Sequence, residues 1–249
     1  MHQAAVGFHC PECVKEGART APVYTARTLP SEQTWATFVL IGINVAVFLW
    51  DISSGGNISN GGGAAYRNGV MAAPLVAFGD WYRLISAGFL HYGVIHLGLN
   101  MLALYVLGPQ LERLLGAIRF LTLYFASLLA GSLGAMLVEP NAATAGASGA
   151  IFGLFGAALA YQLSNHINIW KSGLGGLILM NLVFTFAVPG ISKGGHLGGM
   201  IGGTLVGYAM FELERRRQSP WLGVAFACVL GVSCLVAATL LAPQLAVYR

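Results

Sequence analysis

A serine and a histidine in two glycine-rich stretches are the residues of this chain best suited to covalent chemistry. Ser148 lies in Gly-Ala-Ser-Gly at 146–149, and His196 lies in Gly-His-Leu-Gly-Gly at 195–199. A serine hydroxyl is a poor nucleophile at neutral pH unless a neighbouring imidazole takes its proton during attack. If the fold brings the two together, Ser148 is the candidate nucleophile and His196 its general base. Because no Asp or Glu is placed to orient His196, we predict a dyad and not a triad.

A second pair of polar residues, His96 and Asn100, is spaced four apart in an apolar stretch. On a helix this spacing puts both on one face. Polar side chains are costly in lipid, so this face is expected to point into a bundle, where hydrogen bonding between helices is the alternative role. Acyl transfer develops negative charge on a carbonyl oxygen, and fixed donors there contribute roughly 3–4 kcal/mol each. We predict that His96 and Asn100 form an oxyanion hole with the N–H of Ser148, with Gly146 as a further binding residue.

Both halves of the proposed dyad have simpler explanations. Ser148 would cap a helix well, and His196 would fit a membrane interface or bond to a carbonyl. Two features favour chemistry instead. Ser148 opens a short apolar segment, where the preceding loop admits water. Glycines also recur on both segments, so two helices can approach closely and bring Ser148 and His196 to similar depth; they are Gly149, Gly153 and Gly156 on one, and Gly195, Gly199, Gly203 and Gly207 on the other.

The composition indicates an integral membrane protein. Of 249 residues, 56% are hydrophobic and 9% charged, and the mean hydropathy is +0.70. Soluble domains carry roughly 25% charged residues, which a soluble fold of this size needs to cover its surface. Repeated apolar stretches near ~20 residues predict an all-α, polytopic transmembrane helical bundle in a lipid bilayer. The net charge of +4, without a basic stripe, argues against nucleic acid as a partner.

The apolar stretches divide the chain into three parts: a tail at 1–33, a six-span core at 34–212, and a basic linker with a seventh span at 213–249. The stretches lie at about 35–50, 93–107, 118–138, 148–163, 169–188, 195–211 and 221–241, of which the fourth and sixth are short. Residues 51–93 form a long irregular stretch with a semi-apolar patch at 70–78, and its aromatic residues suit an interface.

Lysine and arginine predict the orientation. With seven spans, nine of these residues fall on the side of the N-terminus and four on the other. The excess predicts a multi-pass protein of the cell membrane with its N-terminus in the cytoplasm and its C-terminus outside. The loops at 51–93, 140–147 and 190–194 then face outward and converge on the candidate site. The first ~30 residues lack the apolar region of a signal peptide, so the first span is expected to direct insertion.

The tail contains Cys10 and Cys13 in Cys-x-x-Cys spacing, which suits zinc. A closed structural site needs four ligands, and the tail adds only His2 and His9. We interpret it as an incomplete or vestigial knuckle, with zinc binding in a longer native chain as the open alternative, and we predict no metal or organic cofactor.

These motifs resemble, in order and spacing, those of the rhomboid intramembrane proteases. The resemblance covers about 35–211 and rests on Trp81-Tyr82-Arg83, His91, His96, Asn100, Glu112, the 146–149 stretch and the 195–199 stretch. It implies a six-helix core, with the seventh span as the extra C-terminal helix of some members. It also implies Ser148 as nucleophile, His196 as base, and His96 and Asn100 as oxyanion donors.

The resemblance further implies structural support by Arg83 and Glu112, which would brace the long first loop and the connection between the second and third spans, and by Gly199. One departure is Phe152, because many members have tyrosine four residues after the nucleophile. Stacking on His196 survives this change, whereas any role of the phenol hydroxyl does not. Some rhomboids also carry a longer Cys-rich finger ahead of a tail like this one.

The predicted function is an intramembrane serine endopeptidase that cuts single-span or multi-span membrane proteins in or near their transmembrane segments. Helix-breaking or small residues near the outer face would expose the scissile bond, because helical carbonyls are already hydrogen-bonded. The candidate gates are the loops at 140–147 and 190–194 and the fifth span. A relative that only binds and retains membrane proteins typically lacks the serine or the histidine. A small transporter would show internal repeats, and none is visible.

Overall fold

The computed structural model describes residues 2–3, 8–10 and 34–246. The chain divides into two units, Met1–Gln33 and Thr34–Arg249. In the first unit, β1 (His2–Gln3) pairs with β2 (Phe8–His9) in antiparallel register. Cys10 is exposed. Cys13 lies outside the described residues, so the partial knuckle stays a prediction.

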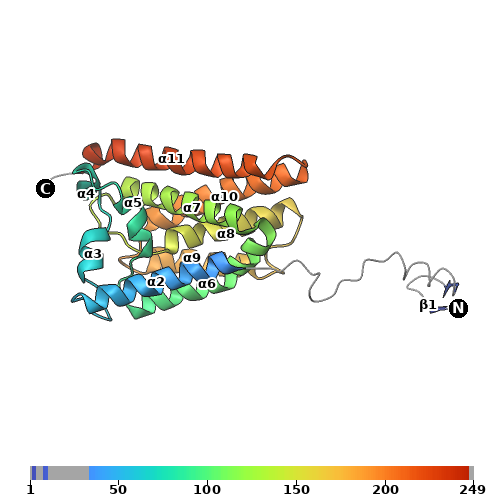
Figure 1. Ribbon diagram of the computed structural model, residues 1–249, viewed down its shortest axis with the longest axis horizontal. Coiled ribbons are helices and arrows are strands. Elements are labelled where there is room, and N and C mark those ends of the chain that lie inside the picture. Colours follow the sequence, from blue (N-terminus) through green and yellow to red (C-terminus); the bar gives the residue numbers. More distant parts are fainter. Residues whose placement is uncertain (1, 4–7, 11–33, 247–249) are drawn as a thin grey trace. The chain divides into compact units, whose positions relative to one another are not determined.

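The second unit is an all-α helical bundle, as predicted (Figure 1). Seven of its helices match the predicted spans in order: α2 (Trp35–Ser53), α6 (Val94–Leu115), α7 (Ala117–Val138), α8 (Ser148–Ser164), α9 (Leu174–Ala187), α10 (Lys193–Arg215) and α11 (Pro220–Leu245). By length and composition, α2, α6, α7 and α11 are able to cross a membrane, while α8 and α9 are shorter apolar helices. The chain is therefore a multi-pass membrane protein.

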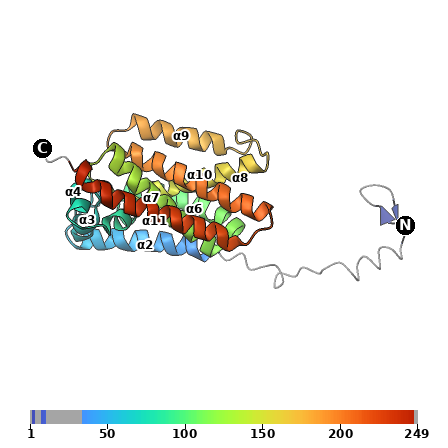
Figure 2. The same ribbon diagram turned by 90° about the horizontal axis from the view of Figure 1, so that it is seen from above.

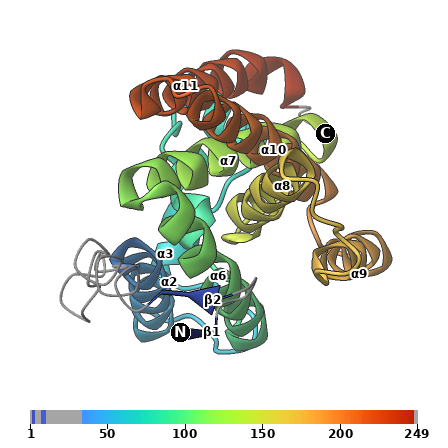
Figure 3. The same ribbon diagram turned by 90° about the vertical axis from the view of Figure 1, so that its right-hand side faces the viewer.

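Helices α7, α8 and α10 form the centre of the bundle, and the others surround them. Helix α11 covers α7 and α10, α2 pairs with α6, and α9 lies at the edge against α8 and α10 (Figures 2 and 3). The side chains of Phe120 and Tyr124 on α7, Leu154 on α8 and Val206 on α10 are fully buried in this centre.

The contact between α8 and α10 depends on glycine. A Cβ added at Gly199 would overlap the backbone of Gly149, and one added at Gly203 would overlap the backbone of Gly153. The glycine spacing in the sequence therefore predicted the right helix pair. A second glycine face of α10, at positions 194, 198 and 202, packs just as closely on α7. Helix α10 is thus held between α7 and α8.

Three helices differ from the predicted spans. Helix α6 continues past residue 107 to Leu115 although it contains Pro109, because Leu111 and Leu115 are buried in the core beyond it. Helix α10 has 23 residues and is not short, since its polar last turn is stabilised by Glu212. Helix α9 begins at Leu174, because residues 169–172 form turns and Gly173, the N-cap, has φ +83°.

The expectation that residues 51–93 lack regular elements is wrong. They contain α3 (Ala64–Gly69), α4 (Ala73–Ala77), α5 (Arg83–Ser86) and the 3₁₀ helix η1 (Ala87–Phe89). The semi-apolar patch is the reason, because its buried side chains pack against the ends of α7 and α11. Backbone hydrogen bonds between Met71 and Thr144 (3.1 and 2.7 Å) tie this segment to the loop before α8. The loops at 51–93 and 140–147 therefore meet.

Candidate catalytic site

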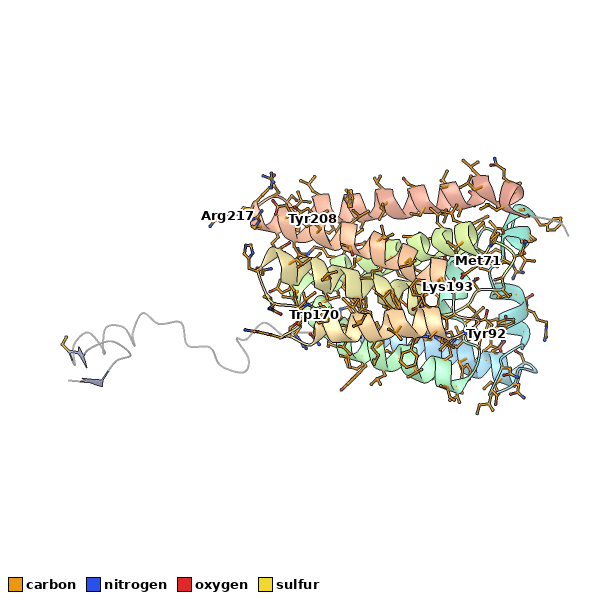
Figure 4. The ribbon with its side chains drawn as sticks, turned by 180° about the vertical axis from the view of Figure 1, so that it is seen from behind. Met71, Tyr92, Trp170, Lys193, Tyr208 and Arg217 are labelled. Carbon is orange, nitrogen blue, oxygen red and sulfur yellow. The ribbon has the colours of Figure 1, made fainter. Side chains whose placement is uncertain are left out.

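A cavity of about 1560 Å³ brings together the predicted chemical residues. Ser148, His196, His96, Asn100 and Gly146 all line it, between α6, α8, α9, α10 and the loop before α8. Tyr92 and Lys193, which also line it, lie at the end of the bundle that carries the short helices (Figure 4). Trp170 and Arg217 lie at the opposite end. The site is therefore displaced toward one end of the bundle.

Ser148 is the first residue of α8 and is half-buried. It does not cap the helix, because the N-cap is Ala147, and its hydroxyl forms no hydrogen bond within the described residues. Gly146 has φ +137°, a conformation that favours glycine. A Cβ there would lie 3.0 Å from His96 Nε2 and 3.5 Å from Ser148 Oγ. Those two atoms are thus no more than 6.5 Å apart across Gly146.

His196 is held on two sides in the first turns of α10. The ring of Phe152 stacks on it, with ring centroids 4.0 Å apart and planes inclined by 16°. His196 Nδ1 lies 2.7 Å from Thr185 Oγ1, and the Thr185 hydroxyl donates to the carbonyl of Asn181. Because that hydroxyl has a single proton, both contacts are hydrogen bonds only when Nδ1 carries the imidazole proton. This assigns the free lone pair of His196 to Nε2.

His96 has the opposite arrangement. Its Nδ1 accepts a long hydrogen bond, 3.4 Å, from the backbone N–H of Tyr92, which assigns its proton to Nε2. The Tyr92 ring stacks on it at 5.8 Å between centroids. Asn100 is buried, and its side-chain amide donates to the carbonyl of His96 at 3.0 Å. One amide proton of Asn100 remains for another acceptor.

Glu139, the acid closest to Ser148 along the sequence, has hydrogen-bond partners other than His196. Its carboxylate accepts from Ser192 Oγ at 2.7 Å and from the Lys193 N–H at 3.0 Å, at the start of α10. Among the described residues no carboxylate bonds to His196. A neutral hydroxyl occupies the place that an acid holds in a triad.

Comparison with known proteins gives the family. A model of the rhomboid domain matches residues 78–213, more than half of the chain. The chain belongs to the rhomboid family. The match contains Ser148, His196, His96 and Asn100, while α11 lies outside it. The predicted resemblance is confirmed.

The relatives include rhomboid proteases. Rhomboid protease GluP of Bacillus subtilis (strain 168) is 37% identical over 177 residues, which cover 70% of this chain and 34% of GluP. YdcA of the same organism is 36% identical over 146 residues, covering 57% of this chain and 73% of YdcA. RHOMBOID-like protein 6, mitochondrial, of Arabidopsis thaliana is 36% identical over 147 residues, covering 56% of this chain and 46% of that protein. The chain thus spans about a third of GluP and is a homologue of rhomboid proteases.

Glu112 joins two helices of the rhomboid core. It is 2% exposed, and its carboxylate accepts from the N–H groups of Ala36 and Thr37, both at 2.9 Å, and from Thr37 Oγ1 at 2.7 Å. Glu112 therefore satisfies donors at the start of α2 that have no partner within the helix. The resemblance implied that Glu112 supports the first loop or the connection between α6 and α7. Its hydrogen bonds instead join α6 to the start of α2.

Arg83 stabilises the segment between α2 and α6. Its guanidinium pairs with Asp80 at 2.8 Å and donates to the carbonyls of Arg67 and Val70 at 3.1 and 2.9 Å. Arg83 is buried, so these contacts join α3, the following loop and α5. These contacts are consistent with the bracing of the first loop that the resemblance implied for Arg83, which stays a prediction.

Three contacts near the rhomboid site have no signal in the sequence. Thr185 meets His196, as described above. Asp51 accepts from the N–H groups of Gly63 and Tyr66 at 3.1 and 2.7 Å, which fixes the start of α3. The Tyr92 hydroxyl donates to the carbonyl of Ala143 in the loop before α8. None of these residues belongs to a recognisable spacing pattern, because each partner lies in a different helix or loop.

Proposed function

We propose that this chain is an intramembrane serine endopeptidase with Ser148 as nucleophile and His196 as general base. The observation that carries the proposal is the pair of histidines that line the cavity with Ser148, one with a backbone N–H and the other with a threonine oxygen at Nδ1. His196 offers an acceptor, Nε2, for the serine proton, while His96 offers a donor, Nε2–H, for a developing oxyanion. The resting Ser148 makes no bond to His196, and such contacts often tighten only when substrate binds.

The reaction follows from these positions. Ser148 Oγ attacks the peptide carbonyl carbon while its proton passes to His196 Nε2. The oxyanion accepts from His96, from the Asn100 amide and from the Ser148 N–H. As the C–N bond breaks, His196 returns the proton to the leaving amine, and Ser148 stays acylated. Water then attacks the acyl carbon and gives a proton to Nε2. As the bond from the acyl carbon to Ser148 Oγ breaks, Nε2 passes that proton to Oγ, which releases the acid and restores both Ser148 and His196.

Phe152 supports His196 by stacking alone, because it has no hydroxyl to bond with substrate or solvent. The stack restricts rotation of the imidazole while leaving both ring nitrogens free for Thr185 and Ser148. A change of Phe152 to tyrosine is therefore expected to have only a modest effect on rate.

The substrates in this proposal are membrane proteins. The cavity reaches exposed apolar side chains of α6 and α9, including Leu99, Met180 and Phe184. A substrate helix that unwinds locally near the outer face would present a free carbonyl there, whereas a helical carbonyl is already bonded. The proposed setting is the cell membrane, and the proposed chemistry calls for no metal, organic cofactor or nucleic acid.

The test compares the parent with Ser148→Ala, both purified in detergent and also reconstituted in liposomes. A fluorophosphonate probe and a single-span model substrate report nucleophile reactivity and cleavage. We expect labelling and cleavage by the parent and neither by the variant. If the parent is folded but is not labelled and does not cleave the substrate, the proposal is wrong. Retention of uncut substrate would then indicate a binding relative, and solute uptake insensitive to Ser148→Ala would indicate a transporter.

A further inference from the structure

We propose that Thr185 is a positioning residue that holds His196 in the tautomer able to accept the serine proton. The proposal rests on the proposed function, because it assigns a partner to the general base of that reaction. A serine protease triad uses a carboxylate at this place. Here a hydroxyl on α9 occupies it, and the hydroxyl orients the imidazole without adding a negative charge.

The proton count supports this tautomer. Thr185 Oγ1 lies 2.7 Å from the Asn181 carbonyl and 2.7 Å from His196 Nδ1, and it has one proton. If Nδ1 carries a proton, both contacts are hydrogen bonds. If Nδ1 is bare, only one of them is, and a buried polar contact is left unsatisfied. Thr185 is fully buried and His196 is 8% exposed, so water does not easily replace the missing bond.

The same bond persists through the reaction. Nδ1–H remains protonated when Nε2 takes the serine proton, so Thr185 accepts from both the neutral and the charged ring. Bonds to charged donors are the stronger ones. Thr185 therefore favours the imidazolium that forms during attack, in addition to fixing the neutral tautomer.

Because Thr185 belongs to α9, the orientation of the general base, His196, depends on the position of that helix. The buried residues of α9 are Leu174, Gly175, Ile178 and Thr185, so Thr185 alone is buried in the half nearest the site. The neighbouring Val183, Phe184 and Phe186 are exposed apolar side chains. Figure 3 shows α9 at the edge of the bundle, beside α8 and α10. A shift of the end of α9 away from α10 would break the bond to His196.

The test uses Thr185→Val, which keeps the shape and removes the acceptor, and Thr185→Ser, which keeps the acceptor. Losing one hydrogen bond that acts in the transition state is expected to lower kcat about tenfold with KM little changed. Serine should restore kcat to within about threefold of the parent, because Oγ is retained. The matched control is Thr204→Val on α10, whose hydroxyl makes the same kind of bond, to Met200 O at 2.7 Å, away from His196.

A second readout does not need activity. Nitrogen-15 shifts of labelled histidine, assigned with His196→Gln, report which ring nitrogen carries the proton in the resting protein. We expect Nδ1–H in the parent and in Thr185→Ser, and a mixture in Thr185→Val. A bare Nδ1 in the parent, or equal tautomers and equal kcat in parent and Thr185→Val, overturns the inference. If the parent is inactive but His196 carries its proton on Nδ1, the proposed protease function is wrong, while the positioning of His196 by Thr185 still holds.

Discussion

At the scale of single residues, the partners of each side chain decide its role more than its type does. His96 and His196 both line one cavity and both have Nε2 free, yet a backbone N–H at Nδ1 of His96 makes its Nε2 a donor, whereas a threonine oxygen at Nδ1 of His196 makes its Nε2 an acceptor. A third histidine, His91, has neither kind of partner among residues 34–246. The same principle applies to Glu112, whose carboxylate stabilises the start of α2 and has no part in the proposed reaction.

Replacing Glu112 with glutamine tests this support role. One of the two carboxylate oxygens becomes an amide nitrogen facing donors of α2, so at least one buried donor loses its acceptor. We expect a loss of about 2–4 kcal/mol in unfolding free energy. Chemical denaturation in mild detergent measures it. Glu214→Gln is the control, because Glu214 is exposed and its carboxylate pairs, within the described residues, only with Arg119; a change there as large as at Glu112 would contradict the assignment.

His91, in the loop before α6, predicts a pH dependence of stability. Burial, aided by the neighbouring His96 ring, lowers the pKa of His91 from 6.5 to about 3, and neither ring nitrogen has a partner of good geometry within the described residues. The unfolded chain therefore binds this proton below pH 6.5 while the folded chain does not. Stability is full above about pH 6.5 and falls as the pH drops toward 3, by about 2 kcal/mol at pH 5.

The measurement compares unfolding of the parent and of His91→Phe between pH 7.5 and pH 4.5 in detergent. Phenylalanine keeps a ring against His96, which now meets the His91 ring edge-on at 5.0 Å between centroids, and it cannot titrate. The unfolding free energy of the parent should fall relative to that of His91→Phe as the pH drops from 7.5 to 4.5. Parallel pH curves for the two proteins would show that His91 contributes nothing.

At the scale of elements, the candidate site depends on how closely α8 approaches α10. Ser148 is at the start of one helix and His196 is near the start of the other, so their separation follows the distance between the helices. Gly149 and Gly199 meet within one turn of both residues, and Gly153 and Gly203 continue the contact deeper in the bundle. Small residues at such contacts are typical of membrane helices.

Gly203→Ala is expected to weaken both stability and activity. The added methyl would overlap the Gly153 backbone, which cannot move aside as a side chain can. Forced overpacking costs about 1–3 kcal/mol, and the shift should reduce kcat more than tenfold, since misplacement of about 1 Å can cost 10²-fold. Gly42→Ala on α2 is the control, because nothing lies within 4 Å of the new methyl. Equal thermal midpoints and equal kcat for both variants would refute the packing argument.

At the scale of the whole molecule, the sequence predicted the helix order and the cluster of site residues, because both follow from local patterns. Apolar runs marked the helices, and glycines at intervals of four predicted the contact between α8 and α10. Thr185 was missed because its role depends on the rotation of α9, which its own residues do not reveal. The short helices between α2 and α6 were missed because a few apolar residues gain stability only when α7 and α11 cover them.

Charge at the two ends of the bundle supports an orientation. Among the described residues, the end opposite the site carries six basic residues: Arg113, Arg119, Lys171, Arg215, Arg216 and Arg217. The site end carries three: Arg67, Arg83 and Lys193. Arg83 is buried and paired, so the difference between exposed charges is larger still. Basic residues favour the cytoplasmic side, so we predict that the candidate site lies near the outer face.

Labelling of single cysteines tests this orientation. In a background with Cys10, Cys13, Cys228 and Cys234 replaced by serine, Asn60→Cys marks the site end and Gln218→Cys marks the other; both positions are exposed. A membrane-impermeant maleimide added to intact cells should label position 60, and label position 218 only after permeabilisation. The reverse pattern would put the site on the cytoplasmic face. Substrates would then have to unwind at the inner leaflet, while the chemistry assigned to Ser148 and His196 would stand unchanged.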